Sequence, residues 1–156
     1  MIRSLTLNDD EKFMKIAIEQ AKLAYKLDEV PIGAVVVDEN GEIISLGHNL
    51  RESKKSPSAH AEVLAIEEAC KKLESWRLLG CTIYVTLEPC IMCAGLMHQS
   101  RISRCVFGAF DKKAGALCTL YQIGNDSRLN HNFDVKGGVL EEECAKLLSD
   151  FFKARR

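Results

Sequence analysis

The sequence predicts an α/β fold, a three-layer α/β/α sandwich around a five-stranded mixed sheet. Short apolar and β-branched runs alternate with stretches of helical periodicity, a pattern typical of a sheet covered by helices on both faces. Asn40-Gly41 is a strong hairpin turn, so the first two strands are expected to be antiparallel and the later ones largely parallel. A length of 156 residues, without a repeat or a linker, predicts a single domain over residues 1–156.

The N-terminal half is expected to supply two helices and three strands. Apolar residues recur at helical spacing over residues 8–27, and Asn8 with Glu11 is interpreted as the capping box of this helix. Residues 32–37 are almost continuously apolar, which is typical of a strand buried on both faces. The remaining elements are a returning strand at 43–47, a polar loop at 50–58, a helix at about 59–74 and a third strand at 81–87.

The C-terminal half is expected to add two strands and three helices. A short helix at about 90–99 has Pro89 in its first position, where the missing N–H costs nothing. Gly137-Gly138 ends the last strand before the final helix. The other predicted elements are a strand at 105–108, a short helix near 117–123, a strand at 133–136 and a helix from about 140 onward.

The composition limits the classes to which the protein can belong. A net charge of −1 gives no global attraction to a polyanion, so contact with nucleic acid must rest on local basic clusters. No apolar run is long enough to cross a membrane, and the N-terminus lacks the pattern of a secretory signal. The seven cysteines are odd in number, which favours a reduced, cytoplasmic compartment over a disulfide framework.

Two short motifs hold the residues best suited to metal binding and catalysis. They are His60-Ala61-Glu62 and Pro89-Cys90-Ile91-Met92-Cys93. Cys90 and Cys93 are three residues apart, so they share one face of a helix. Both motifs lie at predicted helix N-termini, where the helix dipole favours a thiolate and a neutral imidazole. A catalytic zinc commonly takes three protein ligands and keeps a fourth position for water. The pattern therefore predicts one zinc ion per chain, bound by His60, Cys90 and Cys93.

Glu62 follows the histidine closely and need not be a metal ligand. Zinc lowers the pKa of a bound water toward neutrality, and a carboxylate beside it can take a proton and pass it to a substrate. Two other interpretations of the motifs stay open at this point. A C-x-x-C pair also occurs in redox proteins, and a structural zinc site would take a fourth ligand from Cys81, Cys105 or His98.

The pair H-x-E and P-C-x-x-C is the signature of zinc-dependent nucleobase deaminases, and the chain resembles the cytidine deaminase-like zinc family. Within that family it is similar to the bacterial tRNA-specific adenosine deaminases (TadA). The similarity runs from about residue 13 to the C-terminus. The matching stretches are 30–35, 60–62, 84–95, 100–102, 106–109 with Asp111, 129–131, 143–145 and 150–156.

The resemblance implies hydrolytic deamination of adenosine to inosine at the wobble position of a tRNA anticodon, carried out by a homodimer. His60, Cys90 and Cys93 match the zinc ligands of the family and Glu62 matches its proton shuttle, so that zinc-activated hydroxide attacks C6 of adenine. Asn49 matches a residue that contacts the target nucleotide. Such an enzyme acts on an unstacked base, and an anticodon loop already offers one.

Three further residues are expected to bind the substrate: Asn130 in a polar loop, and Phe152 and Arg155 in a basic C-terminal tail. Lysine and arginine near these positions would contact phosphate. The sequence departs from the family at Phe110, where a polar or basic residue is expected, and over 126–128. The basic clusters are Arg51, Lys54 and Lys55; Arg101, Arg104, Lys112 and Lys113; and Lys153, Arg155 and Arg156.

Two other functions remain to be separated from this one. A deaminase of free bases or nucleosides, such as guanine or cytidine, shares the zinc motif but has no use for a basic tail. A non-catalytic zinc module or RNA-binding scaffold would close the metal site with a fourth protein ligand. Such a site has no need of Glu62 or Asn49.

Overall fold

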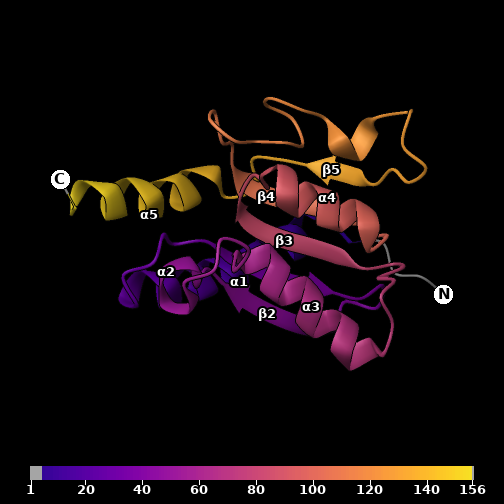
Figure 1. The fold of residues 1–156 in the computed structure, drawn as a ribbon, viewed down its shortest axis with the longest axis horizontal. Coiled ribbons are helices and arrows are strands. Elements are labelled where there is room, and N and C mark those ends of the chain that lie inside the picture. The colour runs from indigo at the N-terminus through magenta and orange to yellow at the C-terminus, as the bar shows by residue number, and fades with distance from the viewer. Residues whose placement is uncertain (1–4, 156) are drawn as a thin grey trace.

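A five-stranded mixed sheet forms the centre of the computed structural model, which describes residues 5–155 (Figure 1). The strand order is β2-β1-β3-β4-β5. β1 is antiparallel to both β2 and β3, whereas β3, β4 and β5 are parallel. The predicted fold class is therefore confirmed. The strands are β1 (Gly33–Val37), β2 (Ile43–His48), β3 (Thr82–Leu87), β4 (Arg104–Ala109) and β5 (Asp134–Lys136).

Helices cover the two faces of the sheet, with α3 and α4 in front of it and α1 behind it in Figure 1. α3 and α4 pack on one apolar core with alternate residues of β1, β3 and β4, such as Val36, Ile83 and Phe107. α1 and α5 pack on the other face, against Val35 and Tyr84. The helices are α1 (Leu7–Lys26), α2 (Arg51–Lys54), α3 (Ala61–Leu73), α4 (Ile91–Gln99) and α5 (Glu141–Lys153), with a 3-10 turn η1 at Ile123–Asn125.

The predicted cap of the first helix is wrong by two residues. Thr6, with an extended backbone, is the N-cap, and its hydroxyl accepts a hydrogen bond of 3.2 Å from the Asp9 N–H. The Asp9 carboxylate in turn accepts from the Thr6 N–H at 3.0 Å. This Thr-x-x-Asp capping box starts the helix at Leu7, so Asn8 and Glu11 lie inside the first turns.

Pro89 does not occupy the first position of α4, contrary to the prediction. Cys90 has an extended backbone and is the N-cap, so the helix begins at Ile91. The Pro89 carbonyl accepts a hydrogen bond of 2.9 Å from the Ala116 N–H. This bond joins the start of α4 to the loop that follows β4.

Two predictions about loops also differ from the structure. The expected short helix near 117–123 is a set of turns, because several of its N–H groups are bound by the carboxylate of Glu88 rather than by a helix. The expected polar loop at 50–58 contains the one-turn helix α2, which ends at Lys55 in a left-handed conformation. No helix among residues 5–155 has the length and apolar character required to span a membrane.

Candidate metal centre

The two predicted motifs meet because α3 and α4 begin at the same end of one face of the sheet. His60 is the N-cap of α3, Cys90 is the N-cap of α4, and Cys93 lies in the first turn of α4. The His60 Nδ1 atom is 3.7 Å from the Cys90 Sγ atom and 3.5 Å from the Cys93 Sγ atom. These three residues are the one group among residues 5–155 whose candidate ligand atoms all lie within 4.8 Å.

The separations fit a tetrahedral zinc ion. Zn–S bonds of about 2.3 Å and Zn–N bonds of about 2.0–2.1 Å place tetrahedral ligands roughly 3.5–3.8 Å apart. The observed N–S distances of 3.5 and 3.7 Å lie in that range. The donor set of one imidazole and two thiols is also one that zinc prefers. The residues present therefore fit a zinc ion without rearrangement.

The electrostatics of the group favour a thiolate. The hydrogen bond with the Cys93 thiol, supported by His60, lowers the pKa of Cys90 to about 3. The same bond and burial raise the pKa of Cys93, so one sulfur is charged and the other holds a proton. The hydrogen bond with Cys90 raises the pKa of His60. Zinc binding displaces the remaining protons, because the metal takes the deprotonated forms.

Glu62 lies in the first turn of α3 and is only 4% exposed. Burial, with the negative charge of Cys90, raises the pKa of Glu62 to about 7. A carboxyl group with such a pKa both accepts and releases a proton near neutral pH. Glu62 lines the same pocket as His60 and Cys90 but is not part of the three-ligand group.

The structure brings no fourth ligand to the group from the residues it describes. Cys105 lies within the apolar core on β4. His98 is in the last turn of α4, where its Nδ1 atom lies 3.3 Å from the His131 carbonyl oxygen. Cys81 precedes β3 and is also part of the core. One coordination position is thus left to water or substrate, which is the arrangement of a catalytic zinc site rather than a structural one.

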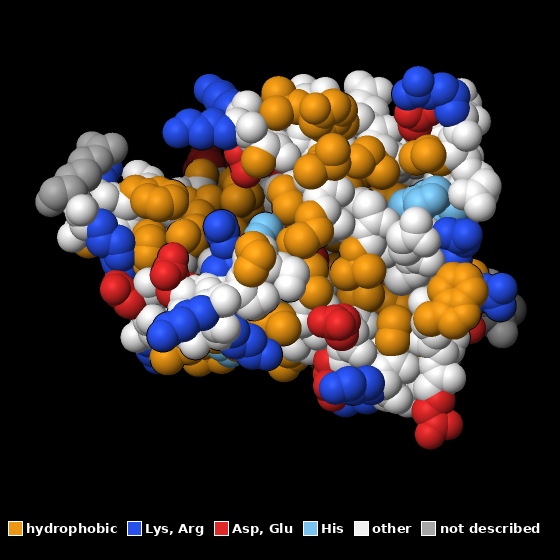
Figure 2. Space-filling view, in the orientation of Figure 1, with side chains coloured by type: hydrophobic (Ala, Val, Ile, Leu, Met, Phe, Trp, Pro, Cys, Tyr) orange, Lys and Arg blue, Asp and Glu red, His pale blue; other side chains and the backbone are white. Residues whose placement is uncertain are grey.

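A pocket of about 540 Å³ opens over the metal group. Its walls come from the entry to β1, from α2, from the loop after β4 and from α5. Apolar side chains dominate the interior, as is typical of a site for a flat organic ligand, and blue Lys and Arg side chains flank orange ones in the left half of Figure 2. The lining residues are Val30, Ile32, Arg51, His60, Glu62, Leu87, Glu88, Cys90, Phe110, Asp111, Lys112, Lys113, Ala114, Leu148 and Phe152.

Of the four predicted substrate residues, Phe152 lines this pocket and Asn49 lies behind its wall. The Asn49 side chain is buried, donates to the Val30 carbonyl at 3.2 Å and accepts from the Arg51 N–H at 3.1 Å. Both of these partners line the pocket. Asn49 therefore holds two wall residues in place and does not itself line the cavity of this conformation.

The other two predicted substrate residues lie outside the pocket lining. Arg155 pairs with Asp28, donates to the Phe151 carbonyl at 2.9 Å and stacks on the Phe151 ring. Asn130 is exposed and precedes His131, whose ring lies 2.8 Å from the Ile102 carbonyl oxygen, beyond the C-terminal end of α4. Their roles as substrate contacts stay predictions.

The basic cluster predicted from Arg101, Arg104, Lys112 and Lys113 is split by the fold, and this prediction is wrong. Lys112 and Lys113 line the pocket. Arg104 forms two hydrogen bonds of 2.8 and 2.7 Å with buried Asp10 at the other end of β4. Arg101 donates to the His98 carbonyl at 2.7 Å. These residues are close in the sequence, but β4 runs between them and places Arg104 and the two lysines at opposite ends of the strand.

Several pocket residues had no signal of their own in the sequence. Val30, Ile32 and Leu148 are apolar residues like those of the core, so composition does not distinguish them. Glu88 did have a signal, because a charged residue between a buried strand and a predicted metal ligand is unusual. It is 2% exposed and its carboxylate is fully hydrogen-bonded.

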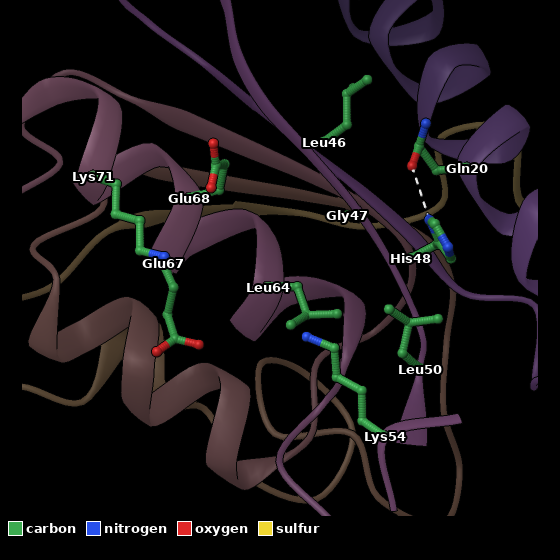
Figure 3. Close-up of a pocket in the computed structure, with 10 residues that line it drawn as sticks. All are labelled: Gln20, Leu46, Gly47, His48, Leu50, Lys54, Leu64, Glu67, Glu68 and Lys71. Carbon is green, nitrogen blue, oxygen red and sulfur yellow. Dashed lines mark hydrogen bonds between the residues drawn. The ribbon is translucent and has the colours of Figure 1, made fainter. Parts of the chain in front are cut away.

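A second groove of about 450 Å³ lies beside the edge strand β2 (Figure 3). Its lining includes His48, whose Nδ1 atom is 3.2 Å from the Gln20 Oε1 atom, and the side chains of Glu67 and Lys71 from α3. None of the three candidate metal ligands lines it. The chemistry of the motifs is therefore confined to the pocket over His60.

A model of the cytidine and deoxycytidylate deaminase zinc-binding region matches residues 7–109. The chain belongs to this deaminase family. It is 55% identical over 150 residues to the tRNA-specific adenosine deaminase of Bacillus subtilis, covering 96% of this chain and 92% of that protein. It is 48% identical over 147 residues to the enzyme of the same name from Haemophilus influenzae, covering 94% and 85%.

A solved structure from a study of A-to-I editing by tRNA:A34 deaminases at the wobble position has a similar fold. Its TM-score is 0.84 at 40% identity, over 88% of this chain and 99% of that one. The match to the family model ends at residue 109 and includes the candidate metal ligands and Glu62. The pocket walls formed by 110–114 and α5 lie beyond the matched residues.

Proposed function

We propose that this chain is a zinc-dependent deaminase that converts adenosine to inosine at the wobble position of a tRNA anticodon. The observation that carries the proposal is the open His60, Cys90 and Cys93 group beside buried Glu62, under a pocket with basic side chains in its walls. Relatives at up to 55% identity that bear this activity in their name support it. We also propose that residues 1–156 act as one domain.

The proposed roles follow from the positions of the side chains. His60, Cys90 and Cys93 hold the metal, and zinc, when bound, lowers the pKa of a water in its open position and so supplies the nucleophile. Glu62 takes a proton and delivers it to the ring nitrogen of adenine as C6 becomes tetrahedral. Glu62 then takes the proton of the new C6 hydroxyl group and gives it to the amino group, so that ammonia leaves and the C6 oxygen becomes the carbonyl of inosine. Its burial keeps the carboxyl group close to the pKa that this exchange needs.

The pocket walls suit a single unstacked nucleotide. Phe110 and Phe152 offer aromatic surface at the pocket, on which a base or ribose can pack. Arg51, Lys112 and Lys113 line the same opening, where the phosphates on either side of the flipped nucleotide would lie. The Phe110 side chain thus supplies stacking surface where the sequence led us to expect a polar contact. We propose Asn130 and Arg155 as more distant RNA contacts.

We further propose that the enzyme is a cytoplasmic homodimer. Ile91 and Met92 at the start of α4, with Leu120 and Tyr121 in the loop before η1, are large apolar residues with 37–58% of their surface exposed. α4 packs on η1, so these side chains belong to one region of the surface. Exposed apolar patches of this kind mark subunit contacts. The described cysteines are all free thiols, as expected in a reducing compartment.

The dimer can be tested separately by sedimentation. The wild-type chain should sediment as a dimer, and Tyr121→Glu should shift it toward the monomer because a charge is placed in an apolar contact. Glu142→Gln on exposed α5 is the matched surface control. Dimers of equal strength in Tyr121→Glu would contradict this contact surface.

The first experiment on the reaction offers the zinc-loaded enzyme an anticodon stem-loop with adenosine at the wobble position. Free adenosine, cytidine and guanine are offered in parallel, and inosine or ammonia is measured. Conversion of the stem-loop and not of the free compounds supports the proposal. Conversion of a free base or nucleoside alone would move the chain to the metabolic deaminases. A zinc-loaded protein that converts nothing would favour a binding scaffold.

A further inference from the structure

The loop after β4 is bound to a single buried carboxylate. Glu88 follows β3 and accepts five hydrogen bonds from this loop. Its Oε1 atom accepts from the Asp111 N–H at 3.1 Å and from the Thr119 hydroxyl at 2.5 Å. Its Oε2 atom accepts from the N–H groups of Leu117, Cys118 and Thr119 at 3.3, 2.8 and 2.9 Å. All five donors are electrically neutral.

The bound loop forms one wall of the pocket. Asp111, Lys112, Lys113 and Ala114 line the cavity between the first and last points of attachment to Glu88. Within the loop, Asp111 Oδ1 accepts from the N–H groups of Lys113 and Ala114 at 3.0 and 3.1 Å. The two lysines are thus carried on a turn whose position is set from Glu88.

The fit between this loop and Glu88 leaves no spare room. A Cβ atom added to Gly115 would collide with the carboxylate of Glu88. The neighbouring Ala116 N–H is bound by the Pro89 carbonyl at 2.9 Å, one residue before the Cys90 ligand. We call the part of the loop that carries Lys112 and Lys113 the lysine wall. The short segment 88–90 therefore fixes the position of the lysine wall relative to the metal group.

We propose that Glu88 is a positioning residue for RNA. It sets the distance between the lysine wall and the metal group, so that a phosphate bound by the lysines places the reacting base at the metal group. This inference rests on the proposed function. Because the donors are neutral, Glu88 holds the loop without pairing with Lys112 or Lys113. Neither lysine has an ion pair with a carboxylate in residues 5–155, so both charges remain available to phosphate.

A positioning role for Glu88 predicts a change in substrate binding without a change in the chemical step, whereas a purely structural role would affect both. Displacing the wall should weaken stem-loop binding while the metal group and Glu62 stay in place. In Glu88→Gln, one carboxylate oxygen is replaced by an NH₂ group that faces N–H donors, so the loop must shift. We expect KM for the stem-loop to rise by about fivefold or more, kcat to change by less than about twofold, and zinc content to stay at one per chain.

A second variant reaches the same contact from the other side. Gly115→Ala leaves Glu88 unchanged but forces the loop away from it, so the same rise in KM is expected. Asp10→Asn is the matched control, since it also removes a buried carboxylate, at the far end of the sheet. Below its melting temperature it should keep the wild-type KM. The Gly115 variant keeps the test decisive if Glu88→Gln does not fold.

Amide hydrogen exchange provides a readout that does not depend on activity. In zinc-loaded Glu88→Gln, the amides of Asp111, Cys118 and Thr119 should exchange faster than in the wild type, while those of α3 should not. Unchanged KM in both loop variants, or a fall in kcat with KM unchanged, would overturn the proposal. If wild-type enzyme converts no stem-loop, the proposed function fails instead, and faster loop exchange would still assign the anchor to Glu88.

Discussion

A buried carboxylate lies at each end of the sheet, and the two are stabilised in different ways. At the end away from the pocket, Asp10 accepts from the two terminal nitrogens of the Arg104 guanidinium, from Lys136 and from the Tyr84 hydroxyl. At the pocket end, Glu88 accepts from backbone N–H groups and one hydroxyl.

Glu29, on the opposite side of the pocket, repeats the pattern seen for Glu88. It is 1% exposed and accepts from the N–H groups of Glu52 and Ser53 at 3.0 and 2.6 Å. These bonds hold α2, which carries Arg51 into the pocket wall. Both walls of the pocket are thus fixed by carboxylates that use neutral donors.

The difference shows how one fold can use the same side chain for stability or for function. Asp10 forms ion pairs with two cations, so Arg104 and Lys136 contribute to the fold and share one negative charge. Glu88 and Glu29 accept from neutral donors, and among residues 5–155 no ion pair joins Arg51, Lys112 or Lys113 to a carboxylate. A region that must bind a polyanion retains its positive charge in this way.

The largest expected effect concerns Glu62, a third carboxylate at the pocket end, for which we propose proton transfer to the substrate. Glu62→Gln should lower kcat on the stem-loop by about a thousandfold, because proton transfer by such a group contributes that order of rate. Zinc content, measured by atomic absorption, should stay at one per chain. Activity within about twofold of wild type would contradict the assigned proton transfer.

Removal of the metal should affect the pocket end of the molecule and leave the Asp10 end unchanged. Chelation should abolish deamination, since the group of His60, Cys90 and Cys93 then lacks its Lewis acid. The network around Asp10 does not touch this group, so the exchange protection of the Tyr84 and Val106 amides should persist. Added zinc should restore activity; failure of zinc to do so in a folded chain would count against a zinc enzyme.

The next prediction concerns how much the Asp10 network contributes to the free energy of unfolding. Asp10→Asn removes the charged acceptor of Arg104 and Lys136 and should lower the free energy of unfolding by about 2 kcal/mol, the typical value for hydrogen bonds to a charged group. Urea denaturation of the zinc-loaded enzyme measures it. kcat and KM at a temperature where the variant is folded should match wild type, and a selective rise in KM would refute the division between the two ends.

A smaller effect is expected from the pocket cations. The double substitution Lys112→Ala with Lys113→Ala should reduce the salt dependence of stem-loop binding by a slope of about one to two, because two phosphate contacts are lost. Lys136→Ala is the matched control, since that lysine is paired with Asp10. An equal change in slope in both variants would show that the lysine wall has no special part in binding.

The smallest effect is a dependence of stability on pH that both ends share. Burial raises the pKa of Asp10, but hydrogen bonds from Arg104 and Tyr84 outweigh it and hold the pKa below the ordinary 3.8. Burial likewise raises the pKa of Glu88, and bonds from the Thr119 hydroxyl and the loop N–H groups hold it below 4.5.

Both carboxylates therefore add stability that is present above their ordinary pKa values and is lost as pH falls through the lower, folded-state values. Thermal unfolding of the wild type from pH 6 to pH 3 should show a falling midpoint, with a shallower fall in Asp10→Asn. Parallel curves for the two proteins would indicate that Asp10 does not contribute in this range.

Local patterns in the sequence were sufficient for the five strands, for the four long helices and for the metal group. The continuous apolar run of β1 and the helical spacing of apolar residues in α1 distinguish strand from helix, because burial on both faces and a 3.6-residue repeat leave different patterns. The zinc motifs could be predicted because each ligand lies at a helix N-terminus that the sequence marks, and His60, Cys90 and Cys93 do meet there. Local signals failed where two caps competed, as at Thr6 and Asn8.

The partners of the charged residues were decided only by the tertiary structure. Arg104 and Asp10 are 94 residues apart in the chain, and Glu88 and Thr119 are 31 apart, so no local pattern specifies either pair. Strand direction places Arg104 at one end of β4 and Lys112 beyond the other, although the sequence shows them as one cluster. The sequence alone determined the fold class and the three residues that meet as the candidate zinc ligands. Packing determined which cations pair with a buried carboxylate and which line the pocket, because that depends on which groups are buried together.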